Sequence, residues 1–296
     1  MLCIVDTNNI IMICFSQALK ALQEKNGIEY EFKEEDLGFF YHILSRKIFP
    51  ILTTYKNIVF CFDHPSGKNW RKEIYPLYKE NRKPIKFIDR KFFDGIRNYL
   101  NLFRCKNFIV DGAEGDDLIY KLCEINEEDI IVISTDGDFR QLLSFFPYVK
   151  LYSPIKMMFL EKNDNILLEK AIIGDTSDNI KGVPRIGKET LKKMLEDKVL
   201  WNKKMTSENI EIMNTIMKIV DLRKSPRELQ DRIEQEWIKT EWNEFKKDEI
   251  EAFFIRYKMV EIFDEWNEIY GKIQLIQNKE FSISSDEELE KMINEL

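Results

Sequence analysis

The sequence predicts an α/β fold with a mostly parallel central sheet flanked by helices. In the first half of the 296-residue chain, short hydrophobic segments typical of strands alternate with longer segments of helical periodicity. Strands that are separated by helices form parallel sheets. Three of these strands lead into aspartates, at Asp6, Asp63 and Asp136. Because open α/β sheets place their functional sites at the carboxyl ends of the strands, we expect these aspartates at one sheet edge.

Each expected element follows from its pattern of apolar residues. A short apolar run bounded by polar residues predicts a buried strand, and apolar residues at helical spacing predict an amphipathic helix. In chain order the patterns predict a strand at 2–5, helices at 10–24 and 37–53, a strand at 57–62, a helix at 89–103, a strand at 107–110, a helix ending near 124, a strand at 129–135, short edge strands at 148–152 and 157–160, and helices near 206–224, 227–239 and 245–270.

Composition excludes several classes of protein. Hydrophobic residues make up 44% and charged residues 33% of the chain, as in a soluble globular protein. We find no apolar run long enough to span a membrane and no signal peptide at the N-terminus. The five cysteines form no C-x-x-C pair, which predicts reduced thiols in a cytoplasmic protein and argues against zinc. Since the chain has two histidines, we expect any metal to be held by oxygen.

An acidic cluster precedes the helix that ends near 124. Glu114, Asp116 and Asp117 fall within four residues, and crowded carboxylates repel unless a cation lies between them. Their oxygens suit Mg²⁺ or Mn²⁺. The alternative is an acidic first turn that complements the helix dipole, which is worth only tenths of a kcal/mol.

Positive charge is concentrated in one segment. The net charge of −7 argues against a nucleic-acid partner, but nine basic and three acidic residues lie between Lys68 and Lys91. Trp70, Tyr75 and Tyr78 are interleaved with them, a combination that can bind phosphates and stack on bases. The alternative is a solvated helical face with the aromatic rings in the core.

A glycine-rich hairpin follows at 182–187. Its backbone N–H groups and the N-terminus of the next helix could hold a phosphate. Asp175 and Asp178 precede it and, three residues apart, face one side of a helical turn. The alternative is a plain connection between two helices.

In this order, the motifs resemble the 5′-nuclease superfamily, which includes flap endonucleases, the 5′-exonuclease domains of bacterial DNA polymerases and phage 5′-nucleases. The motifs resemble in particular those of phage-type members, including the ribonuclease H of T-even phages. The resemblance covers roughly residues 1–195. The matching motifs are Val5-Asp6, Phe62-Asp63, Trp70-Arg71, Tyr78-Lys79-x-x-Arg82, Glu114-x-Asp116-Asp117, Thr135-Asp136-Gly137-Asp138, Gly174-Asp175-x-x-Asp178 and Gly182-Val183-Pro184-x-Ile186-Gly187.

The resemblance implies a PIN-like 5′-nuclease fold in two parts. An α/β catalytic domain would span residues 1–170, with a helical arch at about 64–95 over the site. A helical DNA-binding region would span residues 171–296, with a helix–two-turn–helix element at about 171–197. The implied cofactors are two Mg²⁺ or Mn²⁺ ions, with a K⁺ ion at the hairpin.

Site residues follow from the resemblance by position. Lys79 and Arg82 match the basic pair that contacts the scissile phosphate. The implied metal ligands are Asp6, Asp63, Glu114, Asp116, Asp117, Asp136, Asp138, Asp175 and Asp178. The implied DNA-binding residues are Lys68, Trp70, Arg71, Tyr78, Lys83, Gly182, Val183, Gly187 and Lys188.

The implied activity is a structure-specific 5′-nuclease, either a 5′-3′ exonuclease or a flap endonuclease. It would hydrolyse phosphodiesters by two-metal-ion catalysis in DNA replication or primer removal. The implied substrate is DNA with a free 5′ end, in a flap or in nicked or gapped duplex. The resemblance leaves open RNase H activity on RNA–DNA hybrid, and a single-strand-binding protein or sliding clamp as partner. It implies a monomer without membrane contact, in a bacterial cell or phage-infected host.

Three other functions fit less well. A PIN-type ribonuclease shares the acidic sheet edge but lacks the hairpin and the arch segment. A non-catalytic DNA-binding protein has no use for nine carboxylates along a phosphate path, since these charges repel. A phosphatase with an aspartate nucleophile would carry Asp-x-Asp after its first strand, where this chain has Asp6-Thr7-Asn8.

Overall fold

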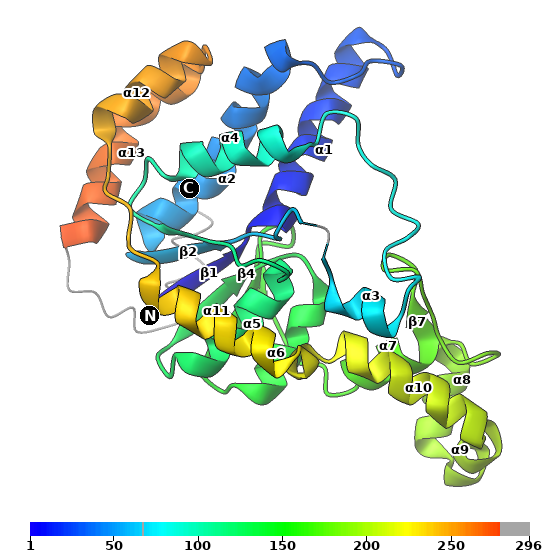
Figure 1. Cartoon of the computed structure of the whole chain (residues 1–296). Helices are drawn as coiled ribbons and strands as arrows, with labels where there is room; N and C mark the ends of the chain where they lie inside the picture. The colour runs from blue at the N-terminus through cyan, green and yellow to red at the C-terminus, as the bar shows by residue number, and fades with distance from the viewer. Residues whose placement is uncertain (67, 279–296) are drawn as a thin grey trace.

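The computed structural model describes residues 1–66 and 68–278. These residues form a six-stranded sheet with the strand order β3-β2-β1-β4-β5-β6 (Figure 1). The first five strands in this order are parallel, and β6 pairs antiparallel with β5. The predicted α/β fold with a mostly parallel sheet is confirmed. The strands are β1 Leu2–Asp6, β2 Asn57–Cys61, β3 Lys106–Phe108, β4 Ile130–Ile133, β5 Val149–Ser153 and β6 Met158–Leu160.

Helices cover both faces of the sheet, because successive residues of each strand point to opposite sides. In β1, Cys3 and Val5 join one hydrophobic core, whereas Leu2 and Ile4 join the other. The first core is closed by α1 Thr7–Asn26, α2 Leu37–Thr54, α4 Arg90–Leu100, α12 Lys247–Arg256 and α13 Val260–Asn278. The second core is closed by α5 Gly115–Ile125, α6 Arg140–Phe145 and α11 Arg227–Lys239. The two groups of helices lie on opposite sides of the sheet in Figure 1.

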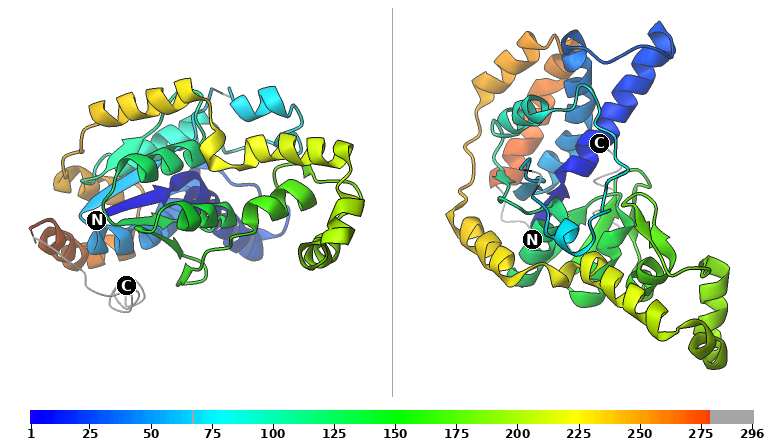
Figure 2. Two further views of the ribbon diagram at one scale, coloured as in Figure 1. Left: turned by 90° about the horizontal axis from the view of Figure 1, so that it is seen from below. Right: turned by 45° about the vertical axis from the view of Figure 1, so that its right-hand side comes forward.

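A helical projection extends from the sheet, and Figures 1 and 2 show its end at α8 and α9. Its own small core includes Ile172, Val183, Ile186, Leu191 and Met194. After α9, helix α10 packs against α7 and also against α3 (Trp70–Ile74). Through α10 the chain returns from the projection to the sheet. The elements of the projection are α7 Ile166–Ile173, β7 Gly174–Asp175, β8 Ile180–Lys181, α8 Lys188–Glu196, α9 Lys198–Lys204 and α10 Ser207–Val220.

The last two helices pack on the first face of the sheet and not on the projection. Phe254 of α12 and Trp266 of α13 lie in the core that also contains residues of α1 and α2. Arg46 of α2 forms a two-pronged ion pair with Glu265 of α13. The region that we expected at 171–296 is therefore divided, because residues 246–278 share a core with the N-terminal half. Residues 279–296 lie outside the described residues.

Three expected helices differ from the observed ones. The helix expected at 245–270 is two helices, because the chain turns at Lys258, whose φ is 54°. The helix expected near 206–224 ends at Val220, before a 3₁₀ turn at Leu222–Lys224. In the segment expected to form a helical arch, the described residues between Asp63 and the start of α4 contain one short helix, α3. Two prolines at 76 and 84 cannot donate helical hydrogen bonds there. No helix in the described part of the chain has the length and apolar character needed to cross a membrane.

Replacing Gly182 with alanine is expected to destabilise the projection by about 1–3 kcal/mol, the usual cost of overpacking a site that cannot adjust. A Cβ atom there would lie 2.2 Å from the carbonyl carbon of Ile173 and 2.3 Å from the carbonyl oxygen of Ile172. These are backbone atoms of α7, so they cannot rotate away as a side chain can. Thermal unfolding followed by circular dichroism measures the loss. Gly187→Ala is the control, because a Cβ there meets nothing within 4 Å; an equal loss in both variants would contradict the prediction.

Candidate functional site

The parallel strands deliver acidic side chains to one edge of the sheet. Asp6 is the last residue of β1, Asp63 follows β2 closely, and Asp136 follows β4. Because β1 pairs in parallel with both β2 and β4, the carboxyl ends of these strands lie side by side. The N-terminus of α5 adds Glu114, which is its N-cap residue, and Asp116.

These acids line a cavity of about 350 Å³. Eight of the nine acids predicted from the sequence are present in its wall, together with three basic side chains. The acids are Asp6, Asp63, Glu114, Asp116, Asp136, Asp138, Asp175 and Asp178. The basic residues are Lys79, Arg82 and Lys170. The structure thus brings the acids of the sheet edge together with those of the loop that precedes the hairpin.

Hydrogen bonds hold the acids of the sheet edge in place. The Ser134 hydroxyl donates to Asp6 Oδ2 at 2.6 Å, and the Asn9 amide donates to Asp6 Oδ1 at 3.3 Å. The Gly115 amide, in the first turn of α5, donates to Asp63 Oδ1 at 2.6 Å. The donors belong to α1, to the loop after β4 and to the first turn of α5, so three separate elements fix the two carboxylates.

Burial raises the pKa values of four of these acids, Asp6, Asp63, Asp116 and Asp138. Burial raises the pKa of Asp6 to about 7 in spite of the Ser134 hydrogen bond, with contributions from Asp63 and Asp136. Burial, followed by the charge of Asp136, raises the pKa of Asp138 to about 6. Carboxyl groups whose pKa is raised by burial and like charges ionise readily when a cation lies beside them. The cavity therefore favours bound positive charge.

Glu114 already has such cations. Burial alone would raise its pKa, but Arg71 and Lys79 outweigh burial and hold the pKa at about 2. Lys79 Nζ lies 2.5 Å from Oε1 of Glu114, and Arg71 Nη1 lies 2.9 Å from Oε2.

Lys170 is a cavity residue that the sequence analysis missed. Its ammonium group lies 2.6 Å from Asp175 Oδ2 and also contacts Asp138, so it bridges two predicted metal ligands. Burial would raise the pKa of Asp175, but Lys170 and Ser177 hold it at about 2. A basic residue in α7, five positions before Asp175, was the available signal. Nearby, Arg82 Nη2 donates to Asp178 Oδ1 at 2.6 Å.

The donor set fits hard divalent cations. In residues 1–66 and 68–278, no three acidic, cysteine or histidine side chains converge as they would around a bound metal ion. Instead, the ammonium groups of Lys79 and Lys170 lie among the carboxylates, where cations are favoured. All of the acidic donors are oxygens, the ligands that Mg²⁺ and Mn²⁺ prefer. The oxygen donors of the cavity are therefore of the type that would hold such ions.

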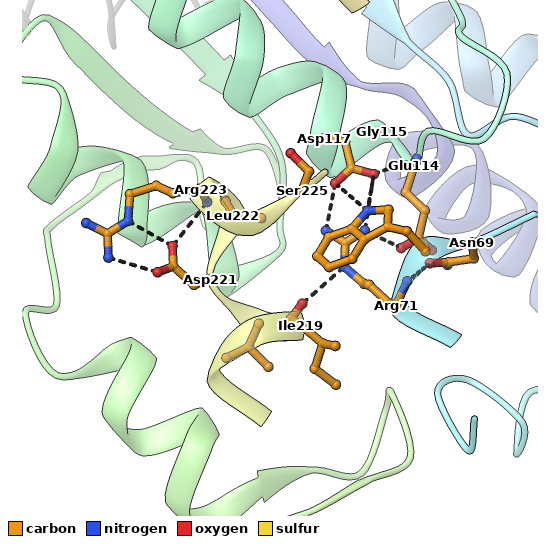
Figure 3. Close-up of polar contacts among 12 residues, drawn as sticks. Asn69, Arg71, Glu114, Gly115, Asp117, Ile219, Asp221, Leu222, Arg223 and Ser225 are labelled. Atoms are coloured by element: carbon orange, nitrogen blue, oxygen red, sulfur yellow. Dashed lines mark hydrogen bonds and ion pairs between the residues drawn. The ribbon is translucent and has the colours of Figure 1, made fainter. Parts of the chain in front are cut away.

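Asp117 lies outside the cavity, and the structure contradicts its prediction as a metal ligand. Arg71 Nη2 donates to Oδ1 at 2.9 Å and Nη1 donates to Oδ2 at 3.1 Å (Figure 3). The Glu114 amide also donates to Oδ2 at 3.0 Å, and Trp70 Nε1 lies 3.3 Å from Oδ1. With both oxygens engaged and the side chain enclosed, Asp117 is a buried ion-pair partner.

Three residues expected to contact DNA are buried instead. Trp70 is 7% exposed, and Arg71 and Tyr78 are each 2% exposed. Their rings and guanidinium group therefore cannot stack on bases or bind phosphates, and we correct those predictions. The physical reason is the acidic start of α5: Arg71 and Trp70 are partners of the buried Asp117, and the Tyr78 hydroxyl donates to Glu114.

The remaining predicted DNA contacts lie partly at the surface. Lys68, Lys83, Gly187 and Lys188 are exposed, and their contact with DNA stays a prediction. Val183 does not fit the prediction of a DNA contact, because its side chain is buried and its amide donates to the carbonyl of Ile172 at 2.7 Å. At Gly182 the backbone of α7 approaches so closely that a side chain has no room. This packing explains the glycine, and no contact with a phosphate is needed to explain it.

Comparisons with known proteins support the same architecture. The family described as "5′-3′ exonuclease, N-terminal resolvase-like domain" matches residues 1–171. The flap endonuclease Xni of Aliivibrio fischeri (strain MJ11) is 32% identical over 147 residues, which are 44% of this chain and 55% of that protein. DNA polymerase I of Rhizobium leguminosarum is 28% identical over 192 residues, which are 58% of this chain and 18% of that protein.

A solved structure resembles the fold over a longer range. The T5 D15 protein, co-crystallised with metal ions, superposes with a TM-score of 0.52 at 20% identity, covering 80% of this chain and 98% of its own. The match to Xni, in contrast, spans about half of that protein's length.

Proposed function

Since the chain belongs to the 5′-3′ exonuclease family, by the match of residues 1–171, we propose that it is a metal-dependent 5′-nuclease that acts on DNA with a free 5′ end. One observation carries this proposal. Eight carboxylates from the sheet edge and the 174–178 loop line one cavity together with Lys79 and Arg82. A site of this composition can bind cations and, through them and its basic residues, a phosphodiester.

The acids divide into two proposed ligand groups. Divalent cations held by them would supply Lewis acidity for the attacking water and for the leaving 3′-oxygen. One group is Asp6, Asp63, Glu114, Asp116 and Asp136, and the other is Asp138, Asp175 and Asp178. We leave Asp117 out, because Arg71 and Trp70 occupy both of its oxygens.

Lys79 and Arg82 would act on the scissile phosphate. Each now pairs with an acid of the cavity, Lys79 with Glu114 and Arg82 with Asp178. When the acids bind cations, both side chains are free to donate to the nonbridging phosphoryl oxygens and to stabilise the charge that develops there. In-line attack by water would then leave a 5′-phosphate and a 3′-hydroxyl.

The surface of α8 is the proposed contact with duplex DNA. Gly187 precedes the helix as its N-cap residue, and Lys188 opens it, both exposed. The free N–H groups at the N-terminus of a helix and a lysine side chain can both bind a phosphate of the DNA backbone. A K⁺ ion at the hairpin, RNA–DNA hybrid as a substrate, and contact with a sliding clamp or single-strand-binding protein stay predictions from the family resemblance.

The test is cleavage of a 5′-labelled flap substrate with Mg²⁺, with Mn²⁺ and with EDTA. We expect short 5′ fragments only with a divalent ion, and cleavage reduced to background in Asp136→Asn. Asp264→Asn is the matched control, because Asp264 is an exposed acid of α13 and is not among the residues that line the cavity. Binding without cleavage in every metal would favour the non-catalytic DNA-binding protein. Cleavage of unstructured RNA but not of the flap would favour the PIN-type ribonuclease.

A further inference from the structure

Arg71 is enclosed by the protein, and each nitrogen of its guanidinium group donates to a partner. Nη1 donates to Glu114 Oε2 at 2.9 Å and Nη2 to Asp117 Oδ1 at 2.9 Å, while Nε donates to the Ile219 carbonyl at 3.1 Å (Figure 3). The group also lies 4.6 Å from the centre of the Trp70 ring. A buried cation held this fully has one orientation.

These contacts join three parts of the chain that are distant in sequence. Arg71 belongs to α3, its acidic partners begin α5, and Ile219 lies in the last turn of α10. The Asn69 side chain accepts from the Arg71 amide at 2.9 Å and so starts α3 at this point. The guanidinium group is therefore fixed by the helix that carries it and by the end of the projection.

The two oxygens of Glu114 have different surroundings. Oε2 accepts from Arg71 and from the Tyr78 hydroxyl, at 2.9 and 3.1 Å, and both donors are buried. Oε1 accepts from Lys79, whose ammonium group lines the cavity. The buried donors thus fix one oxygen, and the other faces the cavity.

We propose that Arg71, assisted by Tyr78, is a positioning residue that holds Glu114 in the orientation needed to bind a divalent cation through Oε1. This inference rests on the proposed function, since it assigns a role within the same site. Donors that orient a ligating carboxylate in this way strengthen metal binding.

Gln141 provides a matched control for structural loss. It is 1% exposed and holds the same end of α10, with Nε2 donating to the Val220 carbonyl at 3.0 Å and Oε1 accepting from the Leu222 amide at 3.3 Å. None of its recorded contacts reaches an acid of the cavity. Its removal should therefore loosen α10 without altering Glu114.

The experiment is a titration with Mn²⁺ in which free Mn²⁺ is followed by EPR, on the full chain and without DNA. We expect Arg71→Lys to weaken Mn²⁺ binding by about 10–100-fold, because lysine offers a single donor group without the planar fork. Gln141→Leu should lower the melting temperature while its Mn²⁺ affinity stays within about twofold of the unmodified chain. Tyr78→Phe, which keeps the ring, should weaken Mn²⁺ binding by about tenfold. This variant decides the question if Arg71→Lys does not fold.

Three results would overturn the inference. Unchanged Mn²⁺ affinity in folded Arg71→Lys would do so, as would unchanged affinity in Tyr78→Phe if the lysine variant is unfolded. Equal weakening of Mn²⁺ binding in Gln141→Leu would show that the effect comes from a general loosening of α10 and not from the orientation of Glu114. If the unmodified chain binds no Mn²⁺, the proposed function itself fails, which is a separate and distinguishable outcome.

Discussion

Truncation of Trp266 to alanine is expected to lower the free energy of unfolding by about 3–5 kcal/mol, the range for a large buried aromatic residue. Trp266 is 1% exposed, although α13 lies outside the segment that the family matches. Its ring packs between α2 and α12, with centroid distances of 6.0 Å to Phe49 and 5.2 Å to Phe254. Its Nε1 also donates to Glu251 at 3.1 Å, so the variant loses a hydrogen bond as well.

Trp201→Ala is the control that shows how much of the lost unfolding free energy is due to the burial of Trp266. Trp201 in α9 is half-buried and packs against the small core of the projection, so a loss of about 1 kcal/mol is expected. Urea denaturation followed by circular dichroism measures both variants. A loss for Trp266→Ala no larger than for Trp201→Ala would mean that residues 246–278 contribute little to the stability of the sheet.

The sequence was sufficient to predict the sheet and most of the acidic cavity. Alternation of apolar runs with helical periodicity is a local signal, and parallel pairing then brings the ends of separate strands together without further information. Asp6, Asp63 and Asp136 were predictable for this reason, since each stands at the end of a strand or shortly after it.

The basic, aromatic segment was misjudged because its partners are far away in sequence. Trp70 and Arg71 beside exposed lysines have the composition of a DNA-binding surface, but 46 residues later Asp117 provides a buried charge that they neutralise. A pattern of residue types cannot distinguish a guanidinium group that binds phosphate from one that pairs with an enclosed carboxylate. The same limitation hid Lys170, whose partners Asp138 and Asp175 meet only in the folded chain.

Replacing Lys79 with alanine is expected to lower kcat for flap cleavage by about 10²–10³-fold, the cost of removing one donor aimed at developing charge. Lys79 lies at the cavity wall with a φ of 55°, and its amide donates to the Asp178 carbonyl at 2.9 Å, so the backbone fixes its position. Burial would lower the pKa of its ammonium group, but Glu114 raises that pKa well above its usual value. The side chain is therefore a cation throughout the neutral pH range.

The split between kcat and KM distinguishes catalysis from simple attraction of DNA. Lys83 is exposed four residues later, so Lys83→Ala should raise KM a few-fold and leave kcat unchanged, as for a surface contact with phosphate. The fold should tolerate Lys79→Ala, because Arg71 and Tyr78 still donate to Glu114. Single-turnover cleavage at saturating Mg²⁺ measures the chemical step directly. If Lys79→Ala changes KM alone, Lys79 binds the substrate and the transition state equally well. Its role in stabilising the transition state would then be rejected.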